Sequence, residues 1–335
     1  MNIALAGGGS WGTAMARLLS KKGHKVNFYI RNQTTINNIL ESGENSKYLP
    51  GIKVPKNIYL SNDIIKSVEG ADILVLAVPT SAVRVLLTCI KDKLNSSVII
   101  VNLSKGIEID SLKRISEVTG EILPDNPFVA LSGPSHAEEV AKDIPTTVVA
   151  SAIDVKYANI IQDQFSTDNF RIYTNTDLIG VEIGGALKNI IALAAGISDG
   201  LGFGDNTKAA LMTRGMYEMS KMGLMLGANP HTFNGLSGMG DLIVTCTSMH
   251  SRNRRAGILI GKGRSIEEAT KEVGQVVEGI KTTKSAYQLA KKHNIEMPIS
   301  QSLYQVLYNG KDPKDAVNIL MTRKKKEEIE QIFFD

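Results

Sequence analysis

The sequence predicts two domains of different class. An α/β domain with a doubly wound parallel sheet is expected over residues 1–180, and an all-α domain over residues 181–335. In the first half, short runs of β-branched residues alternate with longer helical patterns, which is typical of βαβ units. After about residue 176 the strand patterns stop, and helical stretches separated by glycine-rich segments follow.

The expected elements follow from the period of the apolar residues. We expect strands at 2–7, 25–30, 72–78, 97–103, 128–132, 146–151 and 170–175. The runs at 73–78 and 98–101 are apolar without alternation, so helices should cover both faces of these strands. Helices of the second half are expected at 178–197, 207–227, 265–274, 278–293, 299–308 and 312–332.

Charge and composition exclude several classes of protein. The chain of 335 residues has 38 basic and 34 acidic residues, too balanced for the concentrated basic face of a nucleic-acid binder. The basic stretch Arg323–Lys326 is interpreted as the solvated face of the last helix. No group of His or Cys residues has the spacing of a metal site, so no metal is expected.

The cysteines and the apolar runs bear on the compartment. Two cysteines, Cys89 and Cys246, cannot form a disulfide framework, which favours a reducing compartment. The N-terminal residues show no signal peptide, and the apolar runs at 71–79 and 189–197 are shorter than the about 20 residues of a spanning helix. We expect a cytoplasmic protein without integral membrane association.

A glycine motif stands between the first predicted strand and the first predicted helix. Gly7, Gly9 and Gly12 form G-x-G-x-x-G, which in this context is typical of a Rossmann-like dinucleotide-binding domain. The first glycine makes the tight turn, the second lets the backbone approach a pyrophosphate, and the third allows the helix to pack on the strand. The pyrophosphate would lie at the positive end of the helix.

The end of the second strand bears on cofactor choice. An NAD-selective protein normally has an acidic residue here for the ribose hydroxyl, but Arg31 and Asn32 follow the strand. Arg31 could pair with a 2′-phosphate, which favours NADP(H), or it could be an ordinary exposed residue. The cofactor is therefore expected to be NADP(H) or NAD(H).

Polar residues follow two later strands. Lys105 follows the strand at 97–103, and Gly133 and Ser135 follow the strand at 128–132. Ligands of open parallel sheets bind beyond the carboxyl ends of the strands, so these residues are candidate ligands. An exposed loop lysine is the alternative for Lys105.

The helical half has three further candidates. Lys188 lies in an apolar helical stretch, either at its edge or in a desolvated pocket. Asp241 follows the glycine-rich Gly238–Gly240. Residues 251–254, Ser-Arg-Asn-Arg, suit a phosphate at a helix start, although a basic surface cluster is the alternative.

These motifs together resemble the bacterial-type NAD(P)-dependent glycerol-3-phosphate dehydrogenases. The resemblance runs through nearly the whole chain, in the segments 8–14, 103–108, 131–140, 182–189, 238–242, 251–254 and 276–279. Where the family often has a second basic residue after the second strand, this chain has Asn32, which weakens the case for strong NADPH preference.

The resemblance implies a role for each matched position. Besides the glycines, the implied cofactor-binding residues are Ser10, Trp11, Arg31, Lys105, Ala137, Arg252, Val276 and Glu278. The implied substrate-binding residues are Lys105, Gly133, Ser135, Lys188, Asp241, Ser251, Arg252 and Asn253. Lys188 would be the proton acceptor, with Lys105 polarising the substrate oxygen and Asp241 orienting Lys188 or the substrate hydroxyls.

The resemblance also implies the reaction and its setting. It implies interconversion of dihydroxyacetone phosphate and sn-glycerol 3-phosphate, a supply of glycerol phosphate for phospholipid synthesis, and a homodimer. His136 is interpreted as a structural or capping residue, and Cys246 as a small buried residue. Two alternatives remain: a related 3-hydroxyacid or 6-phosphogluconate type dehydrogenase, and a regulator that binds the dinucleotide without turnover.

Overall fold

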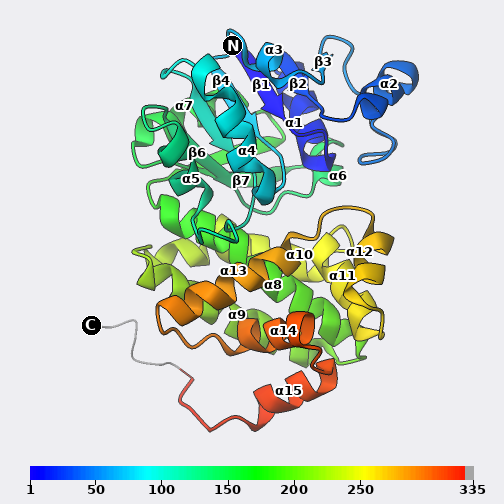
Figure 1. The fold of residues 1–335 in the computed structure, drawn as a ribbon, viewed down its shortest axis with the longest axis vertical. Helices are drawn as coiled ribbons and strands as arrows, with labels where there is room; N and C mark the ends of the chain where they lie inside the picture. The colour runs from blue at the N-terminus through cyan, green and yellow to red at the C-terminus, as the bar shows by residue number, and fades with distance from the viewer. Residues whose placement is uncertain (329–335) are drawn as a thin grey trace. The chain divides into compact units, whose positions relative to one another are not determined.

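The computed structural model describes residues 1–328, and the chain divides into two compact units. Unit 1 comprises Met1–Lys105 and Lys113–Leu178, and unit 2 comprises Gly106–Leu112 and the chain from Ile179 onward. Unit 1 is an α/β domain, and in the described residues of unit 2 every secondary-structure element is a helix (Figure 1). Both fold classes expected from the sequence are confirmed.

Unit 1 contains an eight-stranded sheet in the order β3-β2-β1-β4-β5-β6-β7-β8. Its strands are β1 (Asn2–Ala6), β2 (Lys25–Tyr29), β3 (Tyr59–Ser61), β4 (Ile73–Leu76), β5 (Ile99–Asn102), β6 (Phe128–Ser132), β7 (Thr146–Ser151) and β8 (Phe170–Asn175). Strand β3 is the one element of this sheet that the sequence pattern did not predict. The order reverses direction at β1, and ligands of such sheets bind beyond the strand ends at this point.

One pair of strands departs from the expected parallel sheet. Strands β6 and β7 are antiparallel, while all other neighbours in the sheet are parallel. The connection between them holds only α6 (Ala137–Val140), whose four residues rise about 6 Å. A strand of five residues spans about 17 Å, so this helix is not a crossover helix that would return the chain to the start of β6. The chain instead runs back along β7.

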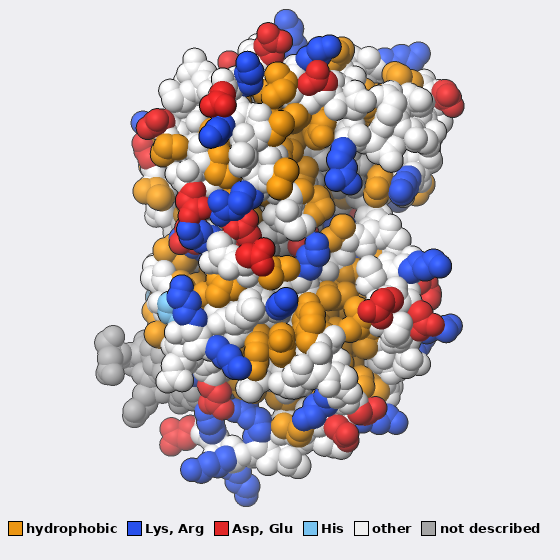
Figure 2. Space-filling view, viewed as in Figure 1, with side chains coloured by type: hydrophobic (Ala, Val, Ile, Leu, Met, Phe, Trp, Pro, Cys, Tyr) orange, Lys and Arg blue, Asp and Glu red, His pale blue; other side chains and the backbone are white. Residues whose placement is uncertain are grey.

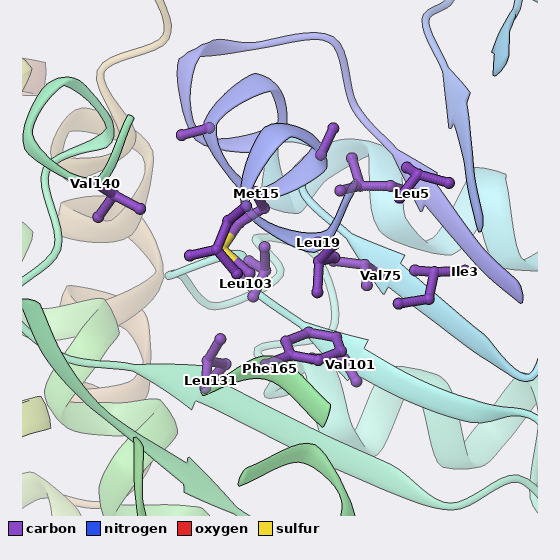
Figure 3. Close-up of a cluster of buried hydrophobic side chains, with 14 of the residues drawn as sticks. Ile3, Leu5, Met15, Leu19, Val75, Val101, Leu103, Leu131, Val140 and Phe165 are labelled. Atoms are coloured by element: carbon purple, nitrogen blue, oxygen red, sulfur yellow. The ribbon is translucent and has the colours of Figure 1, made fainter. Parts of the chain in front are cut away.

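Helices cover both faces of the sheet, as the non-alternating strands predict. The helices of unit 1 are α1 (Ser10–Lys21), α2 (Gln33–Ser42), α3 (Ile64–Val68), α4 (Thr80–Ile90), α5 (Ile115–Ile122), α6 and α7 (Val155–Phe165), with a short 3₁₀ turn at Lys91–Lys93. On β4, Val75 belongs to the core that contains Met15 and Leu19 of α1. Its neighbour Leu74 belongs to the core on the other face. Figure 3 shows Met15 and Leu19 pointing from α1 toward the strands.

Unit 2 is built around the apolar helix α8 (Leu178–Gly200). Its other elements are α9 (Asp205–Met225), the 3₁₀ helix Pro230–Asn234, the π-helix η3 (Leu236–Gly240), α10 (Asp241–Thr247), α11 (Arg252–Gly261), α12 (Ile266–Val273), α13 (Glu278–Lys292), α14 (Pro298–Asn309) and α15 (Pro313–Thr322). Helix α8 is long and apolar enough to cross a membrane, but 83% of its most apolar window is buried. It is the core helix of this unit.

A short segment from the first half of the chain belongs to unit 2. Residues Gly106–Leu112, which lie on the N-terminal side of the single boundary expected at 180/181, pack with the helices. Ile107 is buried in the helical core, and its carbonyl oxygen accepts a hydrogen bond from Ser285 Oγ at 3.1 Å. The apolar side chain of Ile107 thus belongs to a core whose other buried members, Ile183 to Leu307, all lie in the second half of the chain.

The last helix is shorter than predicted. Helix α15 ends at Thr322, whereas the sequence pattern predicted a helix over 312–332, of which 329–332 lie outside the described residues. Arg323 and Lys326 both pair with Glu296, so they do not form the face of a continuing helix. On the face shown in Figure 2, basic and acidic side chains are intermixed.

Helices α8 and α11 approach each other backbone to backbone. A Cβ atom on Gly196 would lie 2.2 Å from Arg254 O, and one on Gly257 would lie 2.2 Å from Leu193 O. Gly200 and Gly261 meet the facing helix in the same way. Because these contacts are with backbone atoms, no side-chain rotation could relieve them. The crossing fixes where α11 begins relative to the middle of α8.

We expect Gly257→Ala to destabilise unit 2 by roughly 1–3 kcal/mol, because the added methyl group forces the two helices apart. Gly120→Ala is the matched control, since Gly120 also lies within a helix, α5, but a Cβ there meets nothing within 4 Å. It should be neutral or stabilise by up to about 1 kcal/mol. Thermal unfolding followed by circular dichroism compares the two. Equal stability of both variants would contradict close packing at Gly257.

Candidate functional site

The glycine loop of unit 1 joins β1 to α1. Gly7 has φ +128°, and a Cβ on it would lie 2.4 Å from Ala77 O. A Cβ on Gly12 would lie 1.9 Å from Gly7 O, so the helix can pack here only without a side chain. A Cβ on Gly9 would meet nothing within 4 Å. The loop is therefore packed tightly at Gly7 and Gly12, and it is open at Gly9.

The open glycine is also the N-cap residue of α1, which has no side-chain cap. The N-terminal backbone N–H groups of a helix form an anion-binding position, and the open space at Gly9 gives a ligand access to them. The residues present thus fit the pyrophosphate of a dinucleotide. Ser10 donates its hydroxyl to Tyr48 O at 2.6 Å, and Trp11 packs against the core of unit 1.

The two residues that follow β2 differ in their surroundings. Arg31 is exposed. Asn32 is the N-cap of α2, and its side chain accepts a hydrogen bond from Thr35 N at 3.2 Å. Asn32, which takes the place of a second basic residue, therefore has a structural role as a helix cap. The sequence did not reveal this role.

The candidate residues after β5 and β6 converge on one carbonyl group. Lys105 Nζ and Ser135 Oγ both donate to Gly133 O, each at 2.9 Å. Gly133 has φ +134°, and a Cβ on it would lie 3.0 Å from the Cα atom of Val148. Ala137 is buried at the start of α6. His136 is the N-cap residue of that helix but makes no side-chain cap hydrogen bond.

In unit 2, Lys188 is buried in an ion pair. Its exposed fraction is 6%, and its Nζ atom lies 2.8 Å from Asp241 Oδ1, whose residue is 1% exposed. Lys188 also donates to Thr245 Oγ1 at 2.6 Å, and that hydroxyl donates to Asp241 O at 2.6 Å. The sequence left open whether Lys188 lies at the edge of the helix or in a desolvated pocket, and in the structure it is buried. Thr245 was missed, although its spacing of four residues from Asp241 places both on one face of α10.

Close packing of backbone brings Asp241 to Lys188. Asp241 follows η3, a π-helix of the kind often found at functional sites. A Cβ on Gly184 of α8 would lie 2.8 Å from Ser237 O, and one on Gly238 would lie 2.1 Å from Phe233 O. The absence of a side chain at Gly184 lets η3 lie directly on α8, one helical turn before Lys188, and the absence of one at Gly238 lets η3 fold tightly against the 3₁₀ helix Pro230–Asn234.

The start of α11 supplies the remaining polar candidates. Ser251 is its N-cap, and its hydroxyl accepts a hydrogen bond from Arg254 N at 3.2 Å. Asn253 is buried, donating to Asn189 Oδ1 at 2.9 Å and accepting from Gly279 N at 2.9 Å. Arg252 is half-buried beside it. The Asn253 amide thus links α8, α11 and α13. Asn189 was not among the expected site residues.

The segment before α13 lies against the same network. A Cβ on Gly279 would lie 2.6 Å from Asn189 O and 2.8 Å from Asn253 Oδ1. Glu278 begins α13 and is partly buried, and Val276 is 38% exposed. These two expected cofactor-binding residues are therefore held close to Asn189 and Asn253 by the backbone at Gly279.

Two further observations bear on the chemistry of unit 2. Burial raises the pKa of the Cys246 thiol to about 12, which makes the thiol a poor nucleophile. Residues 1–328 contain no cluster of three or more His, Cys, Asp or Glu side chains that could hold a metal ion. Lys188 and Asp241 are thus the buried titratable pair beside the start of α11.

The fold and these residues define a class: a dinucleotide-binding protein with a helical unit that buries a lysine–aspartate pair. Sequence models of the N-terminus and C-terminus of NAD-dependent glycerol-3-phosphate dehydrogenase match residues 2–158 and 177–318. The chain therefore belongs to the NAD-dependent glycerol-3-phosphate dehydrogenase family. The expected family and the expected nicotinamide cofactor class are confirmed.

Individual relatives are similar over nearly their full length. A glycerol-3-phosphate dehydrogenase (NAD(P)+) of a Thermoanaerobacter species is 54% identical over 332 residues, 99% of this chain and 100% of the relative. Its counterpart in Clostridium tetani is 56% identical over 326 residues, 97% and 93% of the two chains. The crystal structure of glycerol-3-phosphate dehydrogenase from Coxiella burnetii matches with a TM-score of 0.93 at 37% identity, covering 96% of this chain and 98% of that one.

We expect Asp241→Asn to lower the free energy of unfolding by roughly 3–5 kcal/mol, because it leaves a buried ammonium group without its counter-charge. The double variant Lys188→Met/Asp241→Leu removes both charges and should lose less. Urea unfolding measures all three proteins. A double variant less stable than Asp241→Asn would show that the ion pair is not the dominant interaction at this position.

Proposed function

We propose that this chain is an NAD(P)-dependent glycerol-3-phosphate dehydrogenase in which Lys188 transfers the proton. The reaction interconverts dihydroxyacetone phosphate and sn-glycerol 3-phosphate. The observation that carries the proposal is the buried contact of Lys188 with Asp241 and Thr245, at 2.8 and 2.6 Å. A binding protein has no need of a lysine buried in this way, and the names of the relatives support the substrate.

The residues of unit 1 hold the dinucleotide in this proposal. The N-terminal N–H groups of α1, including those of Ser10 and Trp11, bind the pyrophosphate at the open position of Gly9. Arg31 lies at the adenosine end, and Ala137 contributes at the start of α6. When bound, the nicotinamide supplies the carbon that takes or gives the hydride.

Lys188 moves the proton at the substrate oxygen. In reduction, its ammonium group donates a proton to the carbonyl oxygen as negative charge develops there. In oxidation, its neutral amine accepts the proton of the hydroxyl group. The Asp241 carboxylate stabilises the ammonium form and, with Thr245, fixes the direction of Nζ. Lys105 adds positive charge that stabilises the developing oxyanion.

The start of α11 binds the phosphate of the substrate. Arg252 offers a guanidinium group, which suits phosphate geometry, and Ser251 and Asn253 lie on either side of it. Gly133 and Ser135 contribute backbone and hydroxyl groups to the substrate, and Val276 and Glu278 reach the cofactor. The buried Asn189–Asn253 hydrogen bond at 2.9 Å supports this, because it orders the first turn of α11.

The setting of the reaction completes the proposal. Glycerol phosphate from this enzyme would supply phospholipid synthesis, and the protein would act in the cytoplasm as a homodimer. Two free cysteines, without a disulfide, support a reducing compartment.

Replacement of Lys188 tests the proton transfer. We expect Lys188→Ala to lower kcat for dihydroxyacetone phosphate by roughly 10²–10⁴-fold, while the Kd of the cofactor stays within a factor of about two. The assay follows nicotinamide oxidation with NADPH and with NADH. Lys262→Ala, at an exposed lysine after α11, is the control. A wild-type protein that binds cofactor but does not turn over would overturn the substrate assignment and favour a related dehydrogenase or a sensor.

Replacement of Arg31 tests cofactor choice. We expect Arg31→Ala to raise the KM for NADPH by roughly 10- to 100-fold and that for NADH by much less, because one charged hydrogen bond to the 2′-phosphate is worth roughly 1.5–3 kcal/mol. Asn32→Ala is the control, since it removes a neighbouring side chain that caps α2 but carries no charge. Equal effects of Arg31→Ala on both cofactors would contradict a contact with the 2′-phosphate.

A further inference from the structure

Asn45 is a buried amide that none of the motifs above includes. It lies in the loop between α2 and β3 and is 1% exposed. Its Nδ2 atom donates to Gly8 O at 3.0 Å and to Thr13 Oγ1 at 2.8 Å. Both partners belong to the glycine loop and the first turn of α1. Asn45 thus contacts the loop on both sides of Gly9.

The chemistry of the partners fixes the orientation of the amide. The Gly8 carbonyl can only accept, so the nitrogen of Asn45 must face it. Thr13 Oγ1 accepts from Asn45 and donates its own proton to Gly9 O at 2.9 Å. Gly9 O also accepts from Thr13 N at 2.9 Å, so these side-chain hydrogen bonds hold the Gly8 carbonyl and, together with the first backbone bond of α1, the Gly9 carbonyl.

Holding these carbonyl groups also sets the next N–H groups. In a planar trans peptide the C=O and N–H bonds point in opposite directions. Fixing Gly8 O toward Asn45 directs the N–H of Gly9 away from it, and fixing Gly9 O does the same for the N–H of Ser10. These are N–H groups at the start of α1, where Gly9 leaves open space.

The loop that carries Asn45 is itself fixed. The Asn45 carbonyl accepts from Tyr48 N at 3.1 Å and Leu49 N at 2.7 Å, and Ser10 Oγ donates to Tyr48 O at 2.6 Å. At the base of the loop, Val54 N donates to Gly43 O at 2.9 Å. The amide is therefore held in place from its own side as well as by the glycine loop.

Stability alone does not account for an asparagine at this position. Its Oδ1 atom is buried without a hydrogen-bond partner among the described residues. An unsatisfied buried acceptor costs about 1–3 kcal/mol. The amide nitrogen is the part of the side chain that makes contacts, and both contacts are to the dinucleotide loop.

We propose that Asn45 is a positioning residue for the cofactor, which it serves by aiming the backbone N–H groups of the glycine loop at the pyrophosphate. Thr13 relays this effect to Gly9. The inference rests on the proposed function, since it assumes that unit 1 binds NAD(P)(H).

The test compares cofactor affinity in two variants of similar shape to the natural residues. Asn45→Leu removes the side-chain hydrogen bonds of Asn45, and Thr13→Val removes those of the Thr13 hydroxyl group. We expect the Kd for NADH and NADPH, from fluorescence titration, to rise about tenfold in each. At saturating cofactor, kcat and the KM for dihydroxyacetone phosphate should stay within a factor of about two. Thr13→Ser, which keeps the hydroxyl group, should bind cofactor as the wild type does.

Ser20→Ala is the matched control. Ser20 lies on α1, as Thr13 does, and it is buried. Its hydroxyl group donates to Asn57 Oδ1 at 2.9 Å, away from the glycine loop. This variant should lower the Tm of the cofactor-free protein without changing the Kd of the cofactor. Comparing Tm and Kd across the variants separates lost stability from lost positioning.

Each outcome decides between the explanations. If Asn45→Leu lowers the Tm as Ser20→Ala does but leaves the Kd within a factor of about two, Asn45 is only structural and the proposal fails. Should Asn45→Leu not fold, equal cofactor affinity of Thr13→Val and Thr13→Ser would overturn it instead. A wild-type protein that binds neither NADH nor NADPH would refute the proposed function itself.

Discussion

Backbone-to-backbone packing along α8 is the constraint on which unit 2 depends. Gly184 admits η3, and Gly196 admits the first turns of α11, each within a distance that any Cβ atom would violate. These two approaches bring Asp241 to Lys188, and Asn253 to Asn189. Lys188 and Asn189 of α8 therefore reach Asp241 and Asn253 because glycines at other positions of α8 let η3 and α11 come close. A buried ion pair needs such fixed geometry, since its desolvation is offset only at close contact.

Unit 1 uses the same kind of packing for a different purpose. At Gly7 and Gly12 the missing side chains let the start of α1 pack directly on Gly7 and Ala77, the residues that follow β1 and β4, and the N-terminus of the helix stays open at Gly9. A second layer, formed by Asn45 and Thr13, holds the carbonyl groups of that loop. The glycines permit the loop conformation, and the buried amide selects the direction of its peptide groups.

Strands that are buried on both faces were predictable from the sequence. In β4, for example, every residue is apolar, so the run shows no alternation with polar residues. The sequence missed β3, whose three residues carry too little pattern, and the reversed direction of β7, whose connection to β6 holds only the short helix α6. It also extended the last helix beyond Thr322, where the basic residues instead reach Glu296. In the candidate site, the sequence predicted the glycine motif and the residues after the strands, while Thr245 and Asn189 were noticed only in the structure.

By itself, the sequence determined the two fold classes, the glycine loop and the family, because these depend on local periodicity and on motifs of fixed spacing. The tertiary structure alone decided that Lys188 is buried against Asp241, 53 residues away, and that Asn45 holds a loop 37 residues before it. The fixed spacing of a motif records what neighbouring backbone atoms require. Which distant polar groups meet is decided by helix crossings and loop packing, which no local pattern encodes.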